Sequence, residues 1–324
     1  MTQSLTGEIV PGIWRIEQRL GDRWLYLYLV QGTRPLLVDT GIATSPESAI
    51  LPALARWGIP PGRLGTVLIT HPDVDHFGGN AAMMRAAPQA ELIGHVVDRP
   101  WLESRERILA ERYGWYAAHD LAYPPETMAW IREGLGPDTP LTRTVIGGEW
   151  LDLGGRRVQV LHLPGHSPGH LGLWEPDSGT AIIGDAVLER GLYDVGGRRI
   201  SPPPYFATAP YLQSIAQLEG LAPEHLLTAH YPALHGADVG RFLDASRAFV
   251  GDVAEAVAQV VQDAGRPISL KDVTAGVVAR VGPFDAFATE LAGPVRAHLD
   301  DLVASGVVVP TPAGGWPGWR WTGA

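Results

Sequence analysis

The sequence predicts an α/β protein built as a four-layer αββα sandwich with a small C-terminal domain. Apolar, strand-like runs alternate with helix-like segments from about residue 8 to about residue 240, which favours two sheets under outer helix layers. Beyond this point helical spacing dominates. The length of 324 residues suits one large domain and an appendage, because single cores stop growing at about 250 to 300 residues. We therefore expect domains at residues 1–240 and 241–324.

The N-terminal part is predicted to form an opening hairpin or meander. Ile9–Ile16 and Trp24–Val30 are rich in Ile, Trp, Tyr and Leu and are separated by a polar turn. Leu36–Val38 is a third short strand, and Pro46–Trp57 has the spacing of a helix. The apolar run Val67–Ile69 then predicts a buried strand.

The segment of residues 98–144 is helix-prone and unusually aromatic, and a minimal domain would not need it. Two interpretations stay open. The aromatic side chains could form a satellite cluster that covers one edge of the core. The segment could instead be a lid or pocket wall that determines the choice of substrate. Its aromatic residues include Trp101, Tyr113, Trp115, Tyr116, Tyr123 and Trp130.

Strand-like runs resume after this insert. Leu171–Trp174 is one of them, and Pro210–Gly220 is a predicted helix. Residues 190–208 are rich in Gly and Pro and are predicted to form a long loop. Three further runs lead to a potential metal ligand, namely Val158–Leu163 to His166, Ala181–Gly184 to Asp185, and Leu226–Ala229 to His230.

The C-terminal part predicts three helices and then a hairpin, an order that resembles a winged helix. The helices are expected at Phe242–Asp263, Ser269–Val281 and Gly293–Ala304, and the hairpin at residues 306–322. From Ala245 onward, six Lys and Arg residues stand against eight Asp and Glu residues, a net charge of −2. This charge favours an interface or pocket-wall role over DNA binding.

Composition excludes several classes of function. The formal net charge of −10 argues against a nucleic-acid-binding surface. The chain has no cysteine, so any metal must be bound by nitrogen and oxygen atoms. Residues 1–8 lack the regions of a signal peptide, and no run approaches the ~18 apolar residues of a membrane helix. We expect a cytoplasmic protein without a membrane segment.

The segment Thr70–Gly79 places four potential metal ligands directly after a predicted strand. Buried imidazoles and carboxylates must be desolvated and paired, so they have little use in packing. Binding to metal ions would compensate for this desolvation. For this segment taken alone, the alternative explanation is that the four residues lie on a loop and are solvated by water. The four residues are His71, Asp73, Asp75 and His76.

The order His-x-Asp-x-Asp-His, then His166, Asp185 and His230, resembles the metallo-β-lactamase superfamily, whose first motif is usually His-x-His-x-Asp-His. With Val38-Asp39-Thr40-Gly41, five motifs occur in the right order over roughly residues 8–240. The resemblance implies the four-layer sandwich, and one branch of this superfamily carries a C-terminal winged-helix module.

The resemblance also implies two divalent metal ions and a metal-bound hydroxide that attacks the substrate. Asp75 would orient this hydroxide and pass a proton to the leaving group. His71, Asp73 and His166 would form the first site, Asp75, His76 and His230 the second, and Asp185 would bridge the two ions.

Asp73 departs from the usual pattern, which has a second His at this position. Two dications, three carboxylates and one hydroxide sum to a charge of zero. The usual site has two carboxylates and keeps a charge of +1. We therefore expect the site of this chain to be less electrophilic. Zinc is the first choice of metal, and the extra oxygen ligand makes iron or manganese the alternatives. The shorter side chain could also leave the first site weak or empty. Flavodiiron proteins are similar in having Glu here, but nothing resembling their flavodoxin-like domain follows.

Three further residues are candidates for supporting roles. Asp39 lies in a turn that the resemblance places beneath the first motif. His170 follows His166 by four residues and is expected to contact ligands rather than metal. Tyr193 is a candidate oxyanion donor because it follows Asp185 closely. The histidines outside ligand patterns are expected to be structural, namely His95, His119, His162, His225 and His298.

The leading hypothesis is a metal-dependent hydrolase that cleaves an ester, thioester or lactone of a small, partly apolar molecule. A phosphodiesterase or ribonuclease of the same fold is the first alternative. A binding protein that has lost catalysis and an iron oxygenase-like variant are the others. The expected partner is a small-molecule substrate rather than nucleic acid, and a homodimer is compatible with the sequence.

Overall fold

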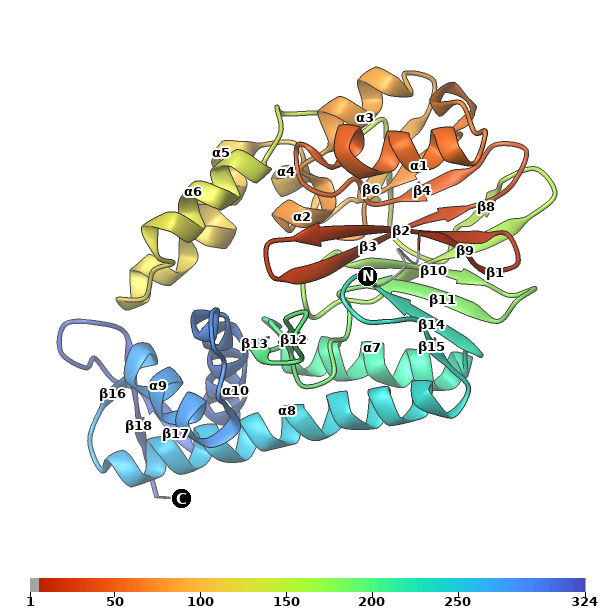
Figure 1. Cartoon of the computed structure of the whole chain (residues 1–324). Helices are drawn as coiled ribbons and strands as arrows, with labels where there is room; N and C mark the ends of the chain where they lie inside the picture. The colour runs from red at the N-terminus through yellow and green to blue at the C-terminus, as the bar shows by residue number, and fades with distance from the viewer. Residues whose placement is uncertain (1–5, 324) are drawn as a thin grey trace.

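Two β-sheets packed face to face form the centre of the molecule (Figure 1). The computed structural model describes residues 6–323. The first sheet has seven strands in chain order, antiparallel from β1 to β4 and parallel from β4 to β7. Its strands are β1 (Gly7–Val10), β2 (Ile13–Leu20), β3 (Arg23–Val30), β4 (Leu36–Val38), β5 (Thr66–Leu68), β6 (Glu91–His95) and β7 (Arg143–Val145).

The second sheet has six strands in the order β15-β14-β11-β10-β9-β8. Only β11 and β14 run parallel among its pairs in the described chain. The strands are β8 (Trp150–Asp152), β9 (Arg157–His162), β10 (Leu171–Glu175), β11 (Thr180–Gly184), β14 (His225–Thr228) and β15 (Leu234–His235).

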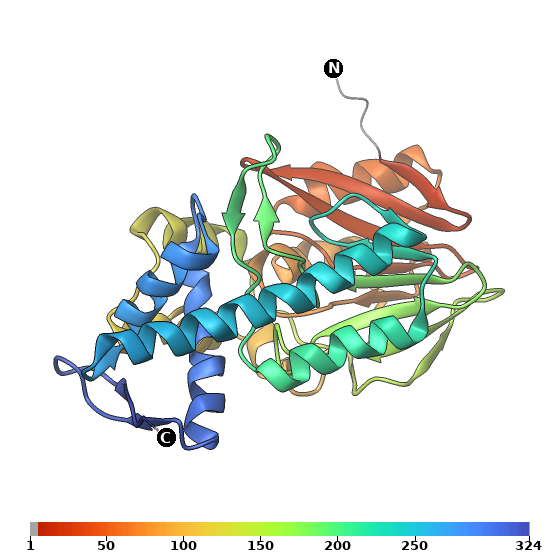
Figure 2. The same ribbon diagram turned by 90° about the horizontal axis from the view of Figure 1, so that it is seen from below.

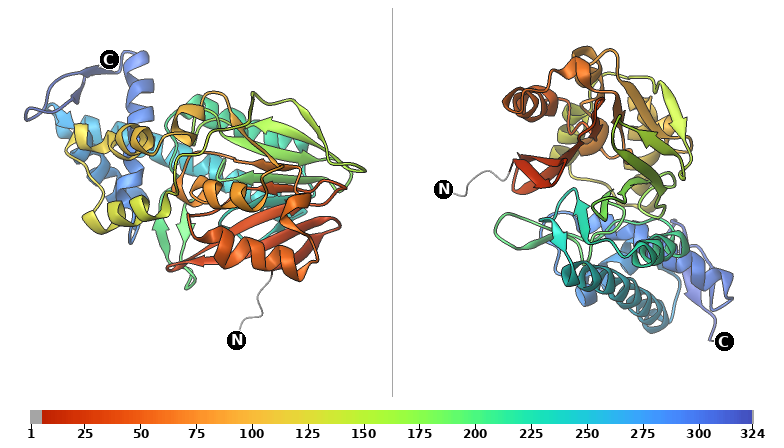
Figure 3. Two further views of the ribbon diagram at one scale, coloured as in Figure 1. Left: turned by 90° about the horizontal axis from the view of Figure 1, so that it is seen from above. Right: turned by 90° about the vertical axis from the view of Figure 1, so that its right-hand side faces the viewer.

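Helices cover the outer face of each sheet (Figures 1 and 3). The first sheet carries α1 and α3, and the second carries α7 and α8. The predicted α/β class and its four layers are confirmed. These outer helices are α1 (Leu51–Arg56), preceded by η1 (Pro46–Ile50) and followed by η2 (Pro61–Arg63), α3 (Asn80–Ala86), α7 (Thr208–Leu221) and α8 (Ala237–Ala264).

Strand β3 shows how the sequence specifies two buried faces of one sheet. Leu25 and Leu27 belong to the apolar cluster under the helices. Tyr26 and Tyr28 belong to the cluster between the two sheets. Successive side chains of a strand point to opposite faces, so an unbroken apolar run is buried on both sides.

Short helical segments separated by turns make up the aromatic insert between residues 99 and 134, and Arg143 and Thr144 at its expected end belong to β7 at the edge of the first sheet. Figures 1 and 3 place its helices at the same end of the sandwich as the C-terminal helices. Tyr116 of the insert and Val295 of the C-terminal part belong to one apolar cluster. The insert consists of α4 (Arg99–Leu102), α5 (Arg105–Ile108), η3 (Leu109–Tyr113), η4 (Trp115–His119) and α6 (Pro125–Gly134).

The segment predicted as a long loop at residues 190–208 contains a short hairpin of β12 (Leu192–Tyr193) and β13 (Arg199–Ser201). Strand β12 has only two residues, and an alternating pattern cannot be recognised in so short a strand. The hairpin lies between the sandwich and the C-terminal helices (Figure 2).

The C-terminal part has the three expected helices and the expected hairpin, and a third short strand joins that hairpin. Helix α8 runs through residue 240 without a break, so the expected domain boundary lies inside a helix. No helix among residues 6–323 is long and apolar enough to cross a membrane. The elements after α8 are β16 (Ile268–Ser269), α9 (Leu270–Val281), η5 (Ala288–Leu291), α10 (Ala292–Ala304), β17 (Val308–Pro310) and β18 (Gly318–Trp321).

Candidate metal centre

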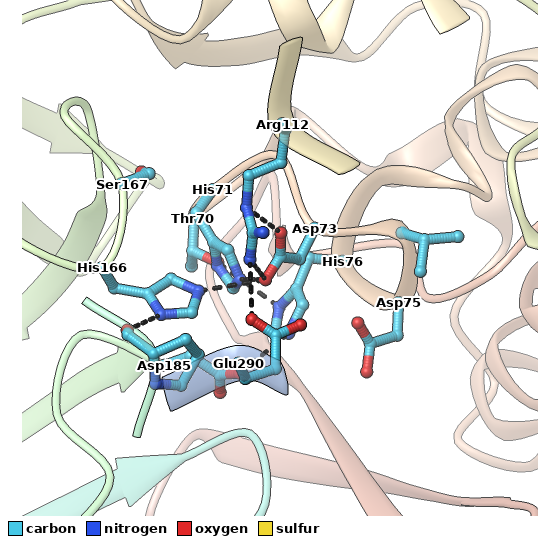
Figure 4. Close-up of polar contacts among 12 residues, drawn as sticks. Thr70, His71, Asp73, Asp75, His76, Arg112, His166, Ser167, Asp185 and Glu290 are labelled. Atoms are coloured by element: carbon cyan, nitrogen blue, oxygen red, sulfur yellow. Dashed lines mark hydrogen bonds and ion pairs between the residues drawn. The ribbon is translucent and has the colours of Figure 1, made fainter. Parts of the chain in front are cut away.

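The loop after β5 and the short helix α2 (Val74–Phe77) present the first group of candidate ligands. Asp73 is the residue before α2 and has extended backbone angles, with φ −84° and ψ 146°. Asp75 and His76 lie in α2 itself. After the change from strand to helix, Asp73 lies with His71 in one group of potential ligands, and Asp75 lies with His76 in a second (Figure 4).

The other candidate ligands follow strands of the second sheet. His166 lies in the loop between β9 and β10, Asp185 follows β11 directly, and His230 lies two residues after β14. Because β11 and β14 are parallel neighbours, Asp185 and His230 leave the same edge of the sheet. The sandwich thereby brings candidate ligands as far apart in the sequence as His71 and His230 to one place.

Ligand atoms form two clusters that match the predicted sites. In the first, Asp73 Oδ2 lies 3.8 Å from His71 Nε2 and 3.1 Å from His166 Nε2. In the second, His230 Nε2 lies 3.7 Å from Asp75 Oδ2. Ligand atoms around a tetrahedral zinc with bonds of about 2.1 Å would be roughly 3.4 Å apart. The clusters therefore have the dimensions of metal sites.

Asp185 lies where a bridging ligand is expected. Its Oδ2 atom is 3.5 Å from His76 Nε2 and 3.2 Å from His230 Nε2. It also groups with His71 and His76 within 4.8 Å, so it reaches ligands of both sites.

In each ligand histidine, Nδ1 contacts an oxygen atom outside the clusters, so Nε2 is the nitrogen atom that faces the other ligands. His76 Nδ1 contacts Asp39 at 2.8 Å, and His71 Nδ1 contacts the Thr70 hydroxyl at 3.0 Å. His166 and His230 place Nδ1 2.7 and 2.8 Å from backbone carbonyls. An outer partner on one ring nitrogen fixes the tautomer and leaves the other nitrogen to bind metal.

Buried polar atoms without partners indicate what the site is built to hold. His71 Nε2, His76 Nε2 and Asp185 Oδ1 have no hydrogen-bond partner among the described residues. Leaving such atoms unpaired in a protein interior is costly, so a bound ligand is expected at this position. Nitrogen and carboxylate oxygen donors fit a pair of divalent metal ions.

The pKa values of three candidate ligands are consistent with a site that binds positively charged ions. Burial would raise the pKa of Asp185, but His230 and His76 hold it well below its usual range. Burial lowers the pKa of His71 far below its usual value, so this imidazole is neutral, as a metal ligand must be. Burial also opposes protonation of His76, yet Asp185 and Asp39 raise its pKa well above the usual value. A metal ion would displace that proton.

A model of the metallo-β-lactamase superfamily matches residues 24–230 of the chain, which include the whole ligand set. The chain belongs to the metallo-β-lactamase superfamily. The metallo-beta-lactamase family protein TTHA1429 from Thermus thermophilus has the same fold, with a TM-score of 0.73 and 23% identity over 97% of this chain and 100% of that one.

One relative is named as a thioesterase and another as a hydrolase. The acyl-coenzyme A thioesterase MBLAC2 of Gallus gallus is 29% identical over 196 residues, which cover 56% of this chain and 65% of that protein. The match thus spans less than two thirds of the thioesterase. The hydroxyacylglutathione hydrolase of Cereibacter sphaeroides is 26% identical over 301 residues, 87% of this chain and 95% of that protein.

Arg112 of the insert contacts the one residue that departs from the superfamily pattern (Figure 4). Its Nε and Nη2 atoms lie 3.3 Å from the two carboxylate oxygens of Asp73. Arg112 is buried, and burial alone would raise the pKa of Asp73, but Arg112 and then His166 hold it below its usual range. Sequence reasoning missed Arg112, because no spacing connects it with the motifs.

This contact bears on the charge count made from the sequence. The count covered the ligands alone. In the structure Arg112 pairs with Asp73 and also lies 3.7 Å from Glu290, so one cation stands between two carboxylates. The count therefore omits two groups of opposite charge beside Asp73, and the expectation of a less electrophilic site stays a prediction.

A cavity of about 80 Å³ lies beside the ligands. The insert contributes Tyr113, Tyr123 and Trp130 to its wall, and the C-terminal part contributes Phe287 and Glu290. The insert thus lines the cavity, and other aromatic residues of it, such as Trp115, pack in the apolar cluster. Its role in the choice of substrate stays a prediction. Sequence reasoning missed Phe287 and Glu290, because their segment carries no motif.

The three supporting residues lie in different settings. Asp39 accepts hydrogen bonds from the backbone N–H and hydroxyl of Thr70 and contacts His76, as expected for a residue beneath the motif. His170 is buried, and its ring stacks on His71 with centroids 4.7 Å apart. Tyr193 packs against Tyr231 and is not among the residues that line the cavity in the described chain.

Asp98 holds the loop that carries His166. It accepts a hydrogen bond of 2.5 Å from the Ser167 hydroxyl and one of 2.9 Å from the Gly169 N–H. Burial raises the pKa of Asp98 from 3.8 to about 6, although both hydrogen bonds oppose this. A buried carboxyl at the base of a ligand loop is a clear target for a stability measurement.

We expect Asp98 to make folding less favourable as pH rises. Because its pKa is higher in the folded state, the cost is absent below about pH 4, grows to about pH 6 and is constant above, reaching roughly 3 kcal/mol at most. The free energy of unfolding of the wild type relative to Asp98→Asn should therefore fall between pH 4 and pH 7. A difference that stays constant in urea titrations across this range would contradict the prediction.

Proposed function

We propose that the protein is a metal-dependent hydrolase that cleaves thioesters, and in a wider sense esters or lactones, of small and partly apolar acids. The observation that carries this proposal is the convergence of two ligand clusters at the wall of a mostly apolar cavity. The names of the two relatives support thioesters as the first substrates to test.

The residues of the chain have distinct parts in this proposal. Bound dications would activate a water molecule and polarise the carbonyl group under attack. Asp75 lies on the cavity wall and is the candidate for orienting the water and returning its proton to the leaving thiol or alcohol. Leu188 and Ile131 line the same cavity and offer apolar contacts to the acyl group. Water adds to the carbonyl carbon, the bond to sulfur or oxygen breaks, and an acid and a thiol or alcohol are released.

Two metal ions per chain are part of the proposal, with zinc first and iron or manganese as alternatives. The His71 side of the site has one carboxylate of its own, Asp73, and the His230 side has Asp75. Arg112 already occupies both oxygens of Asp73 without displacing Asp73 Oδ2 from its place beside His166. These contacts support a role for Asp73 as a metal ligand that also pairs with Arg112.

The test is elemental analysis followed by a substrate panel. Protein expressed with zinc, iron or manganese should contain about two ions per chain and should cleave thioesters faster than bis(p-nitrophenyl) phosphate. Faster phosphodiester cleavage with salt-sensitive RNA binding would favour the nuclease alternative. Less than one ion per chain and no turnover would favour a binding protein, and oxygen consumption with iron would favour an oxygenase.

We also propose that the C-terminal part, beginning within α8, is a winged-helix-like module that serves as a pocket wall. Its elements follow the order helix, strand, helix, helix, strand, strand, with the strands in one sheet. Its net charge of −2 and the position of Phe287 and Glu290 on the cavity wall support a role in substrate binding rather than in DNA binding.

A further inference from the structure

Arg23 is a cation on the cavity wall that the proposed chemistry does not use. It is the only Lys or Arg residue that lines this cavity among residues 6–323. Its side chain is 13% exposed, and its Nη2 atom lies 3.2 Å from Asp75 Oδ2. Its Nε atom is buried without a hydrogen-bond partner in the described part of the chain. A guanidinium has five N–H donors, so one contact leaves most of its capacity free.

Three separate parts of the chain fix the position of this guanidinium. Arg23 begins strand β3 of the sandwich. Its guanidinium lies 5.3 Å from the centre of the Trp130 ring of the insert and 5.7 Å from the Phe287 ring of the C-terminal part. Such contacts hold the group by its faces and leave the N–H groups at its edge available. Arg23 is therefore held in place before any ligand arrives.

The carboxylates near Arg23 have other partners. Glu290 accepts hydrogen bonds from the Tyr116 and Tyr123 hydroxyls and lies 3.7 Å from Arg112. Asp75 is a candidate metal ligand, and its charge would be shared with a dication. The N–H groups of Arg23 that Asp75 leaves free can therefore pair with an anion that enters the cavity. The net charge of −10 opposes anions at long range, so this attraction acts at contact distance.

We propose that Arg23 selects acyl groups that carry their own carboxylate, such as those of short dicarboxylic acids. This inference rests on the proposed hydrolase function. The acyl carboxylate pairs with Arg23 while the thioester carbonyl reaches the ligand clusters, which begin at Asp75 next to Arg23. Arg23 and the ligands Asp75 and Asp185 line the same cavity, so a short acyl chain that enters it meets both.

The test compares two thioesters that differ only at the end of the acyl chain. Glutaryl N-acetylcysteamine ends in a carboxylate, and glutaramoyl N-acetylcysteamine ends in a neutral amide of the same shape. The chain has no cysteine, so a thiol reagent detects only the released product. We expect the metal-loaded wild type to prefer the glutaryl thioester about ten- to hundredfold in kcat/KM, the usual range for one hydrogen-bonded charge.

Arg23→Gln should abolish this preference even if it also slows both reactions through Asp75. The control variant is Arg19→Gln, an exposed residue of the same hairpin, which should keep the wild-type ratio. As a readout apart from turnover, calorimetric binding of glutarate should weaken in Arg23→Gln by a similar factor and stay unchanged in Arg19→Gln.

The outcomes separate this inference from the proposed function. Hydrolysis of neither thioester by the metal-loaded wild type would refute the hydrolase and this inference with it. Hydrolysis of both at similar rates, or an unchanged ratio in Arg23→Gln, would overturn the role of Arg23 and leave the hydrolase standing.

Discussion

Asp185→Ala is expected to remove the bound metal and the hydrolytic activity together. Asp185 is the carboxylate that reaches both His76 and His230, and it groups with His71 as well. Its loss leaves these histidines without a common anion, so we expect metal content to fall from about two ions to less than one per chain. Turnover should fall by at least about a thousandfold, equivalent to roughly 4 kcal/mol of transition-state stabilisation.

Elemental analysis of the dialysed protein and thioesterase assays measure the two effects. Asp177→Ala is a matched control, because Asp177 is exposed in the turn between β10 and β11, the strand that leads to Asp185. Circular dichroism confirms that both variants fold. Full activity in Asp185→Ala would remove this residue from the site, and equal losses in Asp177→Ala would point to the hairpin instead.

Arg112→Met is expected to destabilise the metal-free protein more than any surface substitution. The substitution leaves Asp73 and Glu290 without their buried cation, and breaking a buried ion pair on one side costs about 3 to 5 kcal/mol. The free energy of unfolding, measured by urea titration after chelation, should fall by this amount at pH 7. Adding zinc should recover part of it, because a dication can take over the charge of Asp73.

The pH dependence and a double variant test this explanation. Arg112 keeps the pKa of Asp73 below its usual range, so the stability it provides is present above about pH 4 and is lost as the pH falls further. The gap between wild type and Arg112→Met should therefore shrink below pH 4. Combining Arg112→Met with Asp73→Asn should restore at least half of the loss at pH 7. Arg107→Met, at an exposed position of the same insert, should change little.

The candidate ligands could be predicted from the sequence because each is tied to a local signal. His71, Asp73, Asp75 and His76 follow one apolar run within a few residues, and the structure brings them together with the three later ligands. The alternation of strands and helices likewise predicts the sandwich, since strand and helix periods are local properties. The short hairpin β12–β13 was missed because its strands are too short to show a period.

The partners of these ligands could be found only in the folded chain. Arg112 pairs with Asp73 across 39 positions, Asp98 reaches Ser167 across 69, and Tyr116 reaches Glu290 across 174. None of these pairs leaves a periodic or motif signal in the sequence. The sequence by itself identified the candidate metal ligands, because ligand chemistry belongs to the residue. The tertiary structure decided the charge and the shape around them, because electrostatic and packing contacts depend on distance in space and not along the chain.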